Sequence, residues 1–331
     1  MKRFIYFSKL LFLPVVSVFI CATSAFTQKK LDKEKKAILG EGLALYTLIL
    51  ANWTSNDLYY ENEFNTGYVK GYLSYREKDT IKTIFWREID TASAEYKAKT
   101  FKQVGDTGVV LQQQPKKTED LRVVVKTICY PKMSIKKTNA EIIEEEEREP
   151  NQQEKILMDY RAMVYKEINT DTSFFKQYEG IALKAVPFDA GKEVKVYVYS
   201  SVKKEEVIPF GGDYLLVYDK KTKMMIEKTD FHDDCVFISV QYKGKSYDAS
   251  KSTVHTHKEN ASELITPTDI ATLMLYKNQL EWDEHHVIGG KYTSVFTLAD
   301  RKLDILPTDY FEYLKKKKAD SEKEEQKGKM H

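Results

Sequence analysis

The sequence predicts an α+β protein with a small helix-plus-antiparallel-sheet N-terminal domain, a helical connector and a mixed α/β C-terminal domain. Three observations support this fold class. Apolar residues recur at helical spacing within residues 31–53. Two strand-like stretches, 67–75 and 80–86, flank a polar turn and predict a hairpin. Further along, Val194, Val196 and Val198 alternate with other residue types, which is typical of a half-buried strand.

Length and composition bound the class of protein. The chain has 331 residues, which is enough for two domains, and 42% hydrophobic with 12% aromatic residues can fill sizeable cores. The 52 basic and 50 acidic residues give a net charge of +2. This balance, together with the lack of an aromatic-plus-basic motif, gives no reason to expect a nucleic-acid partner.

The N-terminus predicts a cleaved signal peptide over residues 1–27. Met1-Lys2-Arg3 is basic, residues 10–20 are apolar, and small residues follow at 22–25. An uncleaved N-terminal anchor is the alternative, although the apolar run is short for a membrane span. No later segment is apolar enough to cross a membrane, so we expect a secreted or periplasmic mature protein without a transmembrane span.

The rest of the chain divides by pattern into successive regions. Residues 139–168 predict a charge-rich helix that Pro150 breaks or kinks, with a second helical stretch from Gln153 to Ile168. After position 314 the sequence is polar, which indicates a disordered tail. Cys129 and Cys235 fall in different predicted domains, so two separate buried thiols are expected rather than a pair. The predicted regions are an N-terminal α+β domain at 28–135, a helical connector at 136–170, a C-terminal domain at 171–314 and the tail at 315–331.

One short stretch carries most of the potential chemistry. His255 and His257 are two positions apart on a predicted strand, so their side chains share a face. Thr266 is typical of a helix N-cap, Pro267 of the first helical position, and Asp269 lies three residues after the cap. Two histidines and one carboxylate are a ligand set for Zn²⁺ with an open fourth position.

This pattern resembles the JAB1/MPN/Mov34 (JAMM) metallopeptidase family over residues 192–300. The resemblance implies that His255, His257 and Asp269 bind Zn²⁺ and that Thr266 stands where the family serine stabilises the tetrahedral oxyanion. It also implies hydrolysis of an amide or isopeptide bond in a peptide or protein substrate.

The family mechanism needs a glutamate as general base. Glu206, which lies with Glu205 before a predicted strand, is the selected candidate, and Glu193 and Glu179 are alternatives. His285 and His286 could support the metal ligands from behind or could mark the end of the preceding helix.

A non-catalytic secreted binding or scaffold protein with a degenerate JAMM-like domain is the alternative function. Lys258 in place of the family proline, and one extra position between His257 and Asp269, favour it. A third possibility is that the N-terminal sheet recognises a cell-envelope partner. A separation above about 8 Å between the two histidines and Asp269 would exclude a shared metal, because zinc–ligand bonds are only ~2 Å long.

Overall fold

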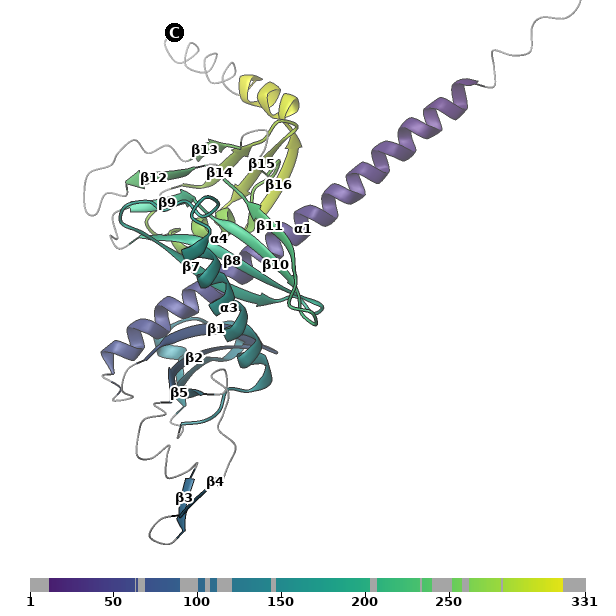
Figure 1. The fold of residues 1–331 in the computed structure, drawn as a ribbon. Helices are drawn as coiled ribbons and strands as arrows, with labels where there is room; N and C mark the ends of the chain where they lie inside the picture. The colour runs from purple at the N-terminus through teal and green to yellow at the C-terminus, as the bar shows by residue number, and fades with distance from the viewer. Residues whose placement is uncertain are drawn as a thin grey trace, which may run out of the picture. The chain divides into compact units, whose positions relative to one another are not determined.

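The chain folds into a mixture of helices and mainly antiparallel sheets, which confirms the predicted α+β class (Figure 1). The structure is a computed structural model. The chain divides into two compact units: unit 1 is Met1–Leu43, Asp248–Ile270 and Glu281–His331, and unit 2 is Ala44–Tyr247 and Ala271–Leu280. The predicted boundaries at 135 and 171 fall inside unit 2. The residues that the structure describes are 12–62, 64, 69–89, 101–104, 108–111, 121–143, 147–202, 207–232, 234–239, 252–257, 262–280 and 282–317.

The first helix, α1, runs from Phe12 to Glu61 and contains the predicted helix. The predicted break at residues 56–57 is wrong, because this end of the helix is anchored in the core of unit 2. Leu58 packs in that core, and the Ser55 hydroxyl lies 2.9 Å from the Tyr130 hydroxyl in a buried hydrogen bond.

Part of α1 is also relevant to localisation. Among the described residues, Gln28–Glu61 is the one helix that is long and apolar enough to cross a membrane. It follows the predicted signal peptide at 1–27, so the expectation that no later segment is this apolar is not met. An apolar helix near the N-terminus is compatible with a signal sequence, although the core helix of a folded domain meets the same criterion.

Unit 2 contains two four-stranded antiparallel sheets, with strand orders β1-β2-β5-β6 and β11-β10-β8-β7. In each sheet the strands are neighbours in chain order, and a helix precedes the first strand, so the same helix-and-meander topology occurs twice. Two-stranded pairs β3-β4 and β9-β12 complete the unit. The strands are β1 (Gly71–Glu77), β2 (Thr80–Glu88), β3 (Phe101–Val104), β4 (Gly108–Leu111), β5 (Arg122–Tyr130), β6 (Glu141–Ile143), β7 (Ile181–Asp189), β8 (Glu193–Val202), β9 (Val207–Gly211), β10 (Tyr214–Asp219), β11 (Met225–Asp230) and β12 (Cys235–Ser239).

The second helix of unit 2, α3 (Gln152–Thr170), packs on both sheets. Leu157 contributes to a cluster with β1, β2 and β5, whereas Val164 contributes to a cluster with β7, β8 and β10. The helix predicted from residue 139 is wrong before Pro150, because Glu141–Ile143 forms β6, whereas the stretch predicted from Gln153 to Ile168 is helical. The helix begins only where a capping box forms: the Asn151 side chain accepts from the Glu154 amide, and the Glu154 carboxylate accepts from the Asn151 amide.

The two cysteines are both buried free thiols, Cys129 in β5 and Cys235 in β12. Burial raises the pKa of Cys235 to about 12, so this side chain remains a neutral thiol near pH 7.

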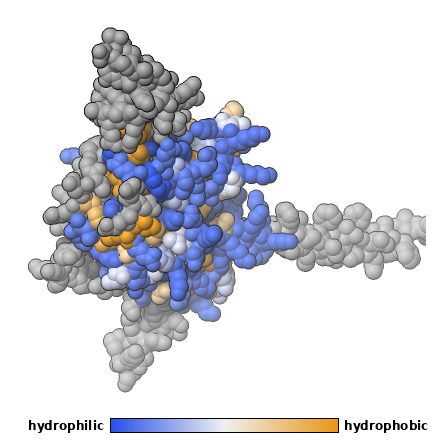
Figure 2. Space-filling model, turned by 90° about the horizontal axis from the view of Figure 1, so that it is seen from below, coloured by the Kyte–Doolittle hydropathy of each residue, from blue (hydrophilic) through white to orange (hydrophobic). Residues whose placement is uncertain are grey.

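The face of the molecule seen in Figure 2 is mostly hydrophilic, and its hydrophobic residues are concentrated in one area. A mostly hydrophilic surface agrees with the 31% of charged residues in the sequence.

Unit 1 contains a four-stranded sheet in the order β13-β14-β15-β16. β13 and β14 are parallel, and the chain between them passes through α4, whereas the other two pairings are antiparallel. Residues 308–317 form a further helix, so the predicted disorder is wrong for residues 315–317, and the rest of the predicted tail lies outside the described residues. The elements are β13 (Ser252–Thr256), α4 (Pro267–Leu275), β14 (Glu284–Ile288), β15 (Tyr292–Thr297) and β16 (Lys302–Pro307).

Candidate metal site

The side chains of the two histidines of the motif project from the same face of the extended chain at β13. His255 lies in the strand, and His257 follows its last residue. The parallel pairing with β14 continues as far as His257, whose amide donates to the Ile288 carbonyl at 3.0 Å. The backbone is therefore held extended across both histidines, and the alternation of side chains along an extended chain brings their rings together. Their Nε2 atoms are 3.0 Å apart.

The carboxylate comes from the first turn of α4, as predicted. The Thr266 hydroxyl accepts from the Asp269 amide at 3.1 Å, and Asp269 Oδ2 accepts from the Thr266 amide at 2.9 Å. This reciprocal cap fixes the Asp269 side chain at the positive end of the helix, where a negative charge is favoured. Ser294 in β15 accepts from the Ile265 amide at 3.1 Å and thereby anchors the approach to the helix. Asp269 is only 2% exposed.

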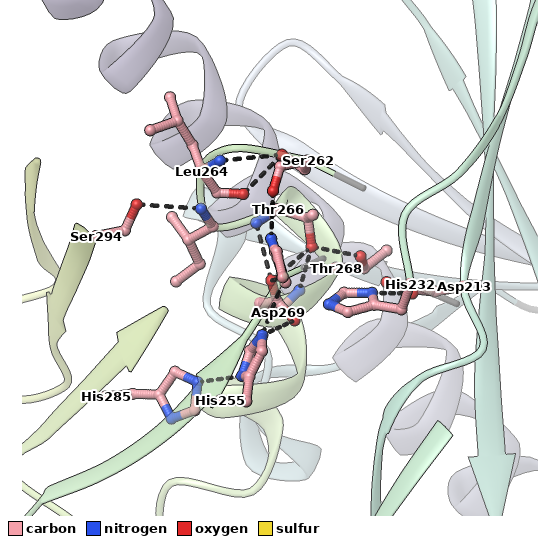
Figure 3. Close-up of polar contacts among 12 residues, drawn as sticks. Asp213, His232, His255, Ser262, Leu264, Thr266, Thr268, Asp269, His285 and Ser294 are labelled. Carbon is pink, nitrogen blue, oxygen red and sulfur yellow. Dashed lines mark hydrogen bonds and ion pairs between the residues drawn. The ribbon is translucent and has the colours of Figure 1, made fainter. Parts of the chain in front are cut away.

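The strand and the helix start converge closely enough to share a metal ion (Figure 3). His255 Nε2 lies 3.9 Å from Asp269 Oδ1, and His257 Nε2 lies 3.8 Å from Asp269 Oδ2. These separations are well inside the 8 Å limit. Tetrahedral zinc with bonds of 2.0–2.1 Å places ligand atoms roughly 3.3 Å apart. The two histidine nitrogens are closer than this, at 3.0 Å, and the two histidine–carboxylate distances, which end on different oxygens of Asp269, are longer. The three residues therefore fit the predicted ligand set.

Hydrogen bonds on the far side of each ring determine which nitrogen faces the group. His257 Nδ1 lies 2.7 Å from the Ser262 carbonyl oxygen. A carbonyl can only accept, so Nδ1 carries the proton and the lone pair of Nε2 is directed at His255 and Asp269. His255 Nδ1 lies 2.9 Å from His285 Nε2, which leaves His255 Nε2 on the side of the carboxylate. Supported ring nitrogens of this kind accompany metal-binding histidines.

The sequence left the role of His285 open between supporting a metal ligand and marking a helix end. His285 lies in β14, not at the end of α4, and is 1% exposed. Burial, followed by the neighbouring His255, lowers its pKa to about 3, so the ring is neutral and can exchange a hydrogen bond with His255. His286 extends to the opposite face of the strand, where it contacts Glu284 at 3.3 Å and the Phe311 ring. The helix-end interpretation of these two histidines is therefore wrong.

The residues predicted to act in catalysis are Thr266 and a glutamate, and the structure describes only some of them. Thr266 is 1% exposed, and its hydroxyl donates to Asp269 Oδ2 at 2.8 Å, so this proton is used within the cap. Glu206 and Glu205 lie outside the described residues. The alternatives Glu193 and Glu179 belong to unit 2, whose sequence range also contains Glu206. Within unit 1, the carboxylate of Glu263 accepts a hydrogen bond from the Lys291 backbone amide at 3.0 Å, so this glutamate is bound to the backbone.

A second buried pair of histidine and carboxylate lies in unit 2 and was not singled out in the sequence. His232 Nδ1 lies 2.5 Å from Asp213 Oδ1 (Figure 3), and both residues are less than 10% exposed. Asp213 precedes β10 and His232 follows β11. The antiparallel pairing of these strands brings the two residues together. No local spacing signals such a pair, because it depends on the hairpin register.

None of the known protein families, curated proteins or solved structures compared with this chain matches it. The JAMM resemblance therefore stays a prediction from the motif.

Proposed function

We propose that unit 1 binds Zn²⁺ through His255, His257 and Asp269 and hydrolyses an amide or isopeptide bond in a peptide or protein substrate. The single observation that supports this most strongly is the convergence of three ligand atoms from two elements, with both imidazole rings oriented by a second hydrogen bond. Zinc in such a site lowers the pKa of a bound water to about 7 and polarises a carbonyl.

The chain's own residues have separate tasks in this proposal. His257, held by the Ser262 carbonyl, and His255, held by His285, keep their Nε2 atoms toward the metal position. Asp269 supplies the negative charge and is fixed by the cap. The general base stays a prediction from the sequence alone, with Glu206 as the candidate. Thr266 would act on the oxyanion only after its hydroxyl turns away from Asp269.

The predicted signal peptide at residues 1–27 supports placing this activity in the periplasm or outside the cell, where the substrate would be a peptide, a protein or a component of the cell envelope. The alternative is a non-catalytic binding or scaffold protein. The commitment of the Thr266 hydroxyl to the helix cap favours that alternative.

Metal content and hydrolysis together test the proposal. We expect the purified protein to hold about one zinc ion per chain by mass spectrometry of the metal, and the His255→Ala/His257→Ala variant to lose it. The matched control is His286→Ala, which alters a histidine on the opposite face of β14 and should retain the metal. Peptide and isopeptide substrates should be cleaved by the wild type, and chelation followed by added zinc should abolish and restore cleavage. Zinc binding without cleavage would favour the binding protein, and no zinc in either protein would refute the site.

A further inference from the structure

Unit 2 contains a cleft of about 500 Å³, and all of its lining residues belong to this unit. This volume is in the range of sites for small organic ligands. Its walls come from α1, β1, β2, α3, β7 and the short helix η2 (Pro131–Met133). Elements distant in sequence therefore form one concavity.

The inner part of the cleft is apolar. Leu48, Ile81 and Leu157 line it and are each less than 5% exposed, so they belong to the fixed core of the unit. Phe188 is half-buried, and Met133 is 40% exposed at the edge. A ligand that enters would remove apolar surface of its own from water without requiring the core to rearrange.

Two cations line the same cleft. Arg76 Nε donates to the Lys78 carbonyl at 2.7 Å, so the backbone of the β1–β2 turn orients the guanidinium and leaves its terminal N–H groups for a ligand. The one acidic residue of the lining, Asp189, is already paired with Lys220 at 2.7 Å. Among the described residues, no acidic side chain is ion-paired with Arg76 or Lys78. The lining therefore has an uncompensated positive charge.

Backbone strain is concentrated at the same edge. Lys78 and Met133 have φ angles of 56° and 52°, in the left-handed region that side chains other than glycine rarely adopt. The Met133 amide donates to the Asp79 carbonyl at 3.0 Å, which ties η2 to the turn. Strained residues held in place by their surroundings are common at ligand sites. The edge that presents the cations is thus held in a defined conformation.

We propose that this cleft binds a single-chain amphiphile of the fatty-acid class, with the hydrocarbon chain against Leu48, Ile81 and Leu157 and the carboxylate at Arg76 and Lys78. An apolar interior with cations at its edge matches an apolar chain with an anionic head. The inference is independent of the proposed metal site.

Calorimetric titration with octanoate, decanoate and dodecanoate, each below its micelle concentration, tests the proposal. We expect one saturable site and roughly fourfold tighter binding for each added methylene, because each buried methylene contributes a constant increment. The Arg76→Gln/Lys78→Gln variant should bind decanoate about tenfold more weakly and should bind neutral decanol as the wild type does. Lys184→Gln/Lys192→Gln, which removes two charges outside the lining, is the matched control and should bind both probes normally.

Two further variants locate the binding. Ala44→Trp should fill the cleft and abolish binding of both probes, with circular dichroism confirming the fold. If that variant does not fold, Phe188→Ala provides the same information, since a half-buried ring can be truncated more safely and its loss should weaken decanoate about tenfold. No saturable binding, affinity that does not depend on chain length, or full binding by a folded Ala44→Trp protein would each overturn the proposal.

Discussion

Replacing Asp269 with asparagine should separate the structural role of this residue from its proposed role as a metal ligand. The asparagine carbonyl can still accept from the Thr266 amide, as Asp269 Oδ2 does at 2.9 Å, so the cap persists. The charge-assisted bond from the Thr266 hydroxyl becomes a neutral one, which should lower the free energy of unfolding by about 1 kcal/mol. The fold should therefore survive the change.

The effect on zinc should be much larger than the effect on the fold. At a zinc concentration 100 times the dissociation constant, binding stabilises the wild type by about 2.7 kcal/mol. A neutral amide should weaken binding by at least ~100-fold, which leaves about 0.4 kcal/mol at the same zinc concentration. At roughly 2 °C per kcal/mol, the wild type should gain ~5 °C in melting temperature and the variant less than ~1 °C.

Thermal unfolding followed by circular dichroism, with and without zinc, measures both quantities. His286→Ala is the control for zinc bound elsewhere on the surface and should show the full wild-type shift. An Asp269→Asn protein that zinc stabilises as much as it stabilises the wild type would refute the assignment of Asp269 as a ligand.

Two further predictions concern stability. Although burial alone would raise the pKa of Glu154, hydrogen bonds from arginine, tyrosine and the Asn151 amide outweigh it and lower that pKa. The contribution of the ionised Glu154 carboxylate to the free energy of unfolding is therefore present above the unfolded-state pKa of about 4.3. This contribution is lost as pH falls through the lower folded-state pKa. Glu154→Gln should cost about 3 kcal/mol at pH 7 in urea unfolding, and the difference from the wild type should shrink below about pH 4; a constant difference would contradict this account. In α1, a Cβ at Gly42 would lie 2.7 Å from the Ile270 Cβ, whereas one at Gly40 meets nothing within 4 Å. Gly42→Ala should destabilise by about 1–3 kcal/mol and Gly40→Ala should stabilise by up to about 1 kcal/mol, and equal effects would show that the close approach to Ile270 does not matter.

Local patterns were sufficient wherever the physical cause is itself local. The hairpin turn between β1 and β2 falls at Lys78 and Asp79, inside the predicted polar turn. The helix start at Pro267 follows its cap as expected. By contrast, the helix predicted from residue 139 does not form at Glu141–Ile143, because these residues pair with β5 instead. Pairing with a distant strand overrides local preference and cannot be read from the segment alone.

The sequence by itself determined the residue types of the candidate site and the local geometry of each half. Two histidines at a spacing of two share a face, and a threonine three residues before an aspartate forms a cap, whatever the rest of the chain does. Only the tertiary structure decided that the two halves meet. The parallel pairing of β13 with β14 sets Thr253 opposite His285 and brings His285 to His255. Such contacts depend on strand register and on how the connecting chain closes, and neither is encoded in the spacing of neighbouring residues.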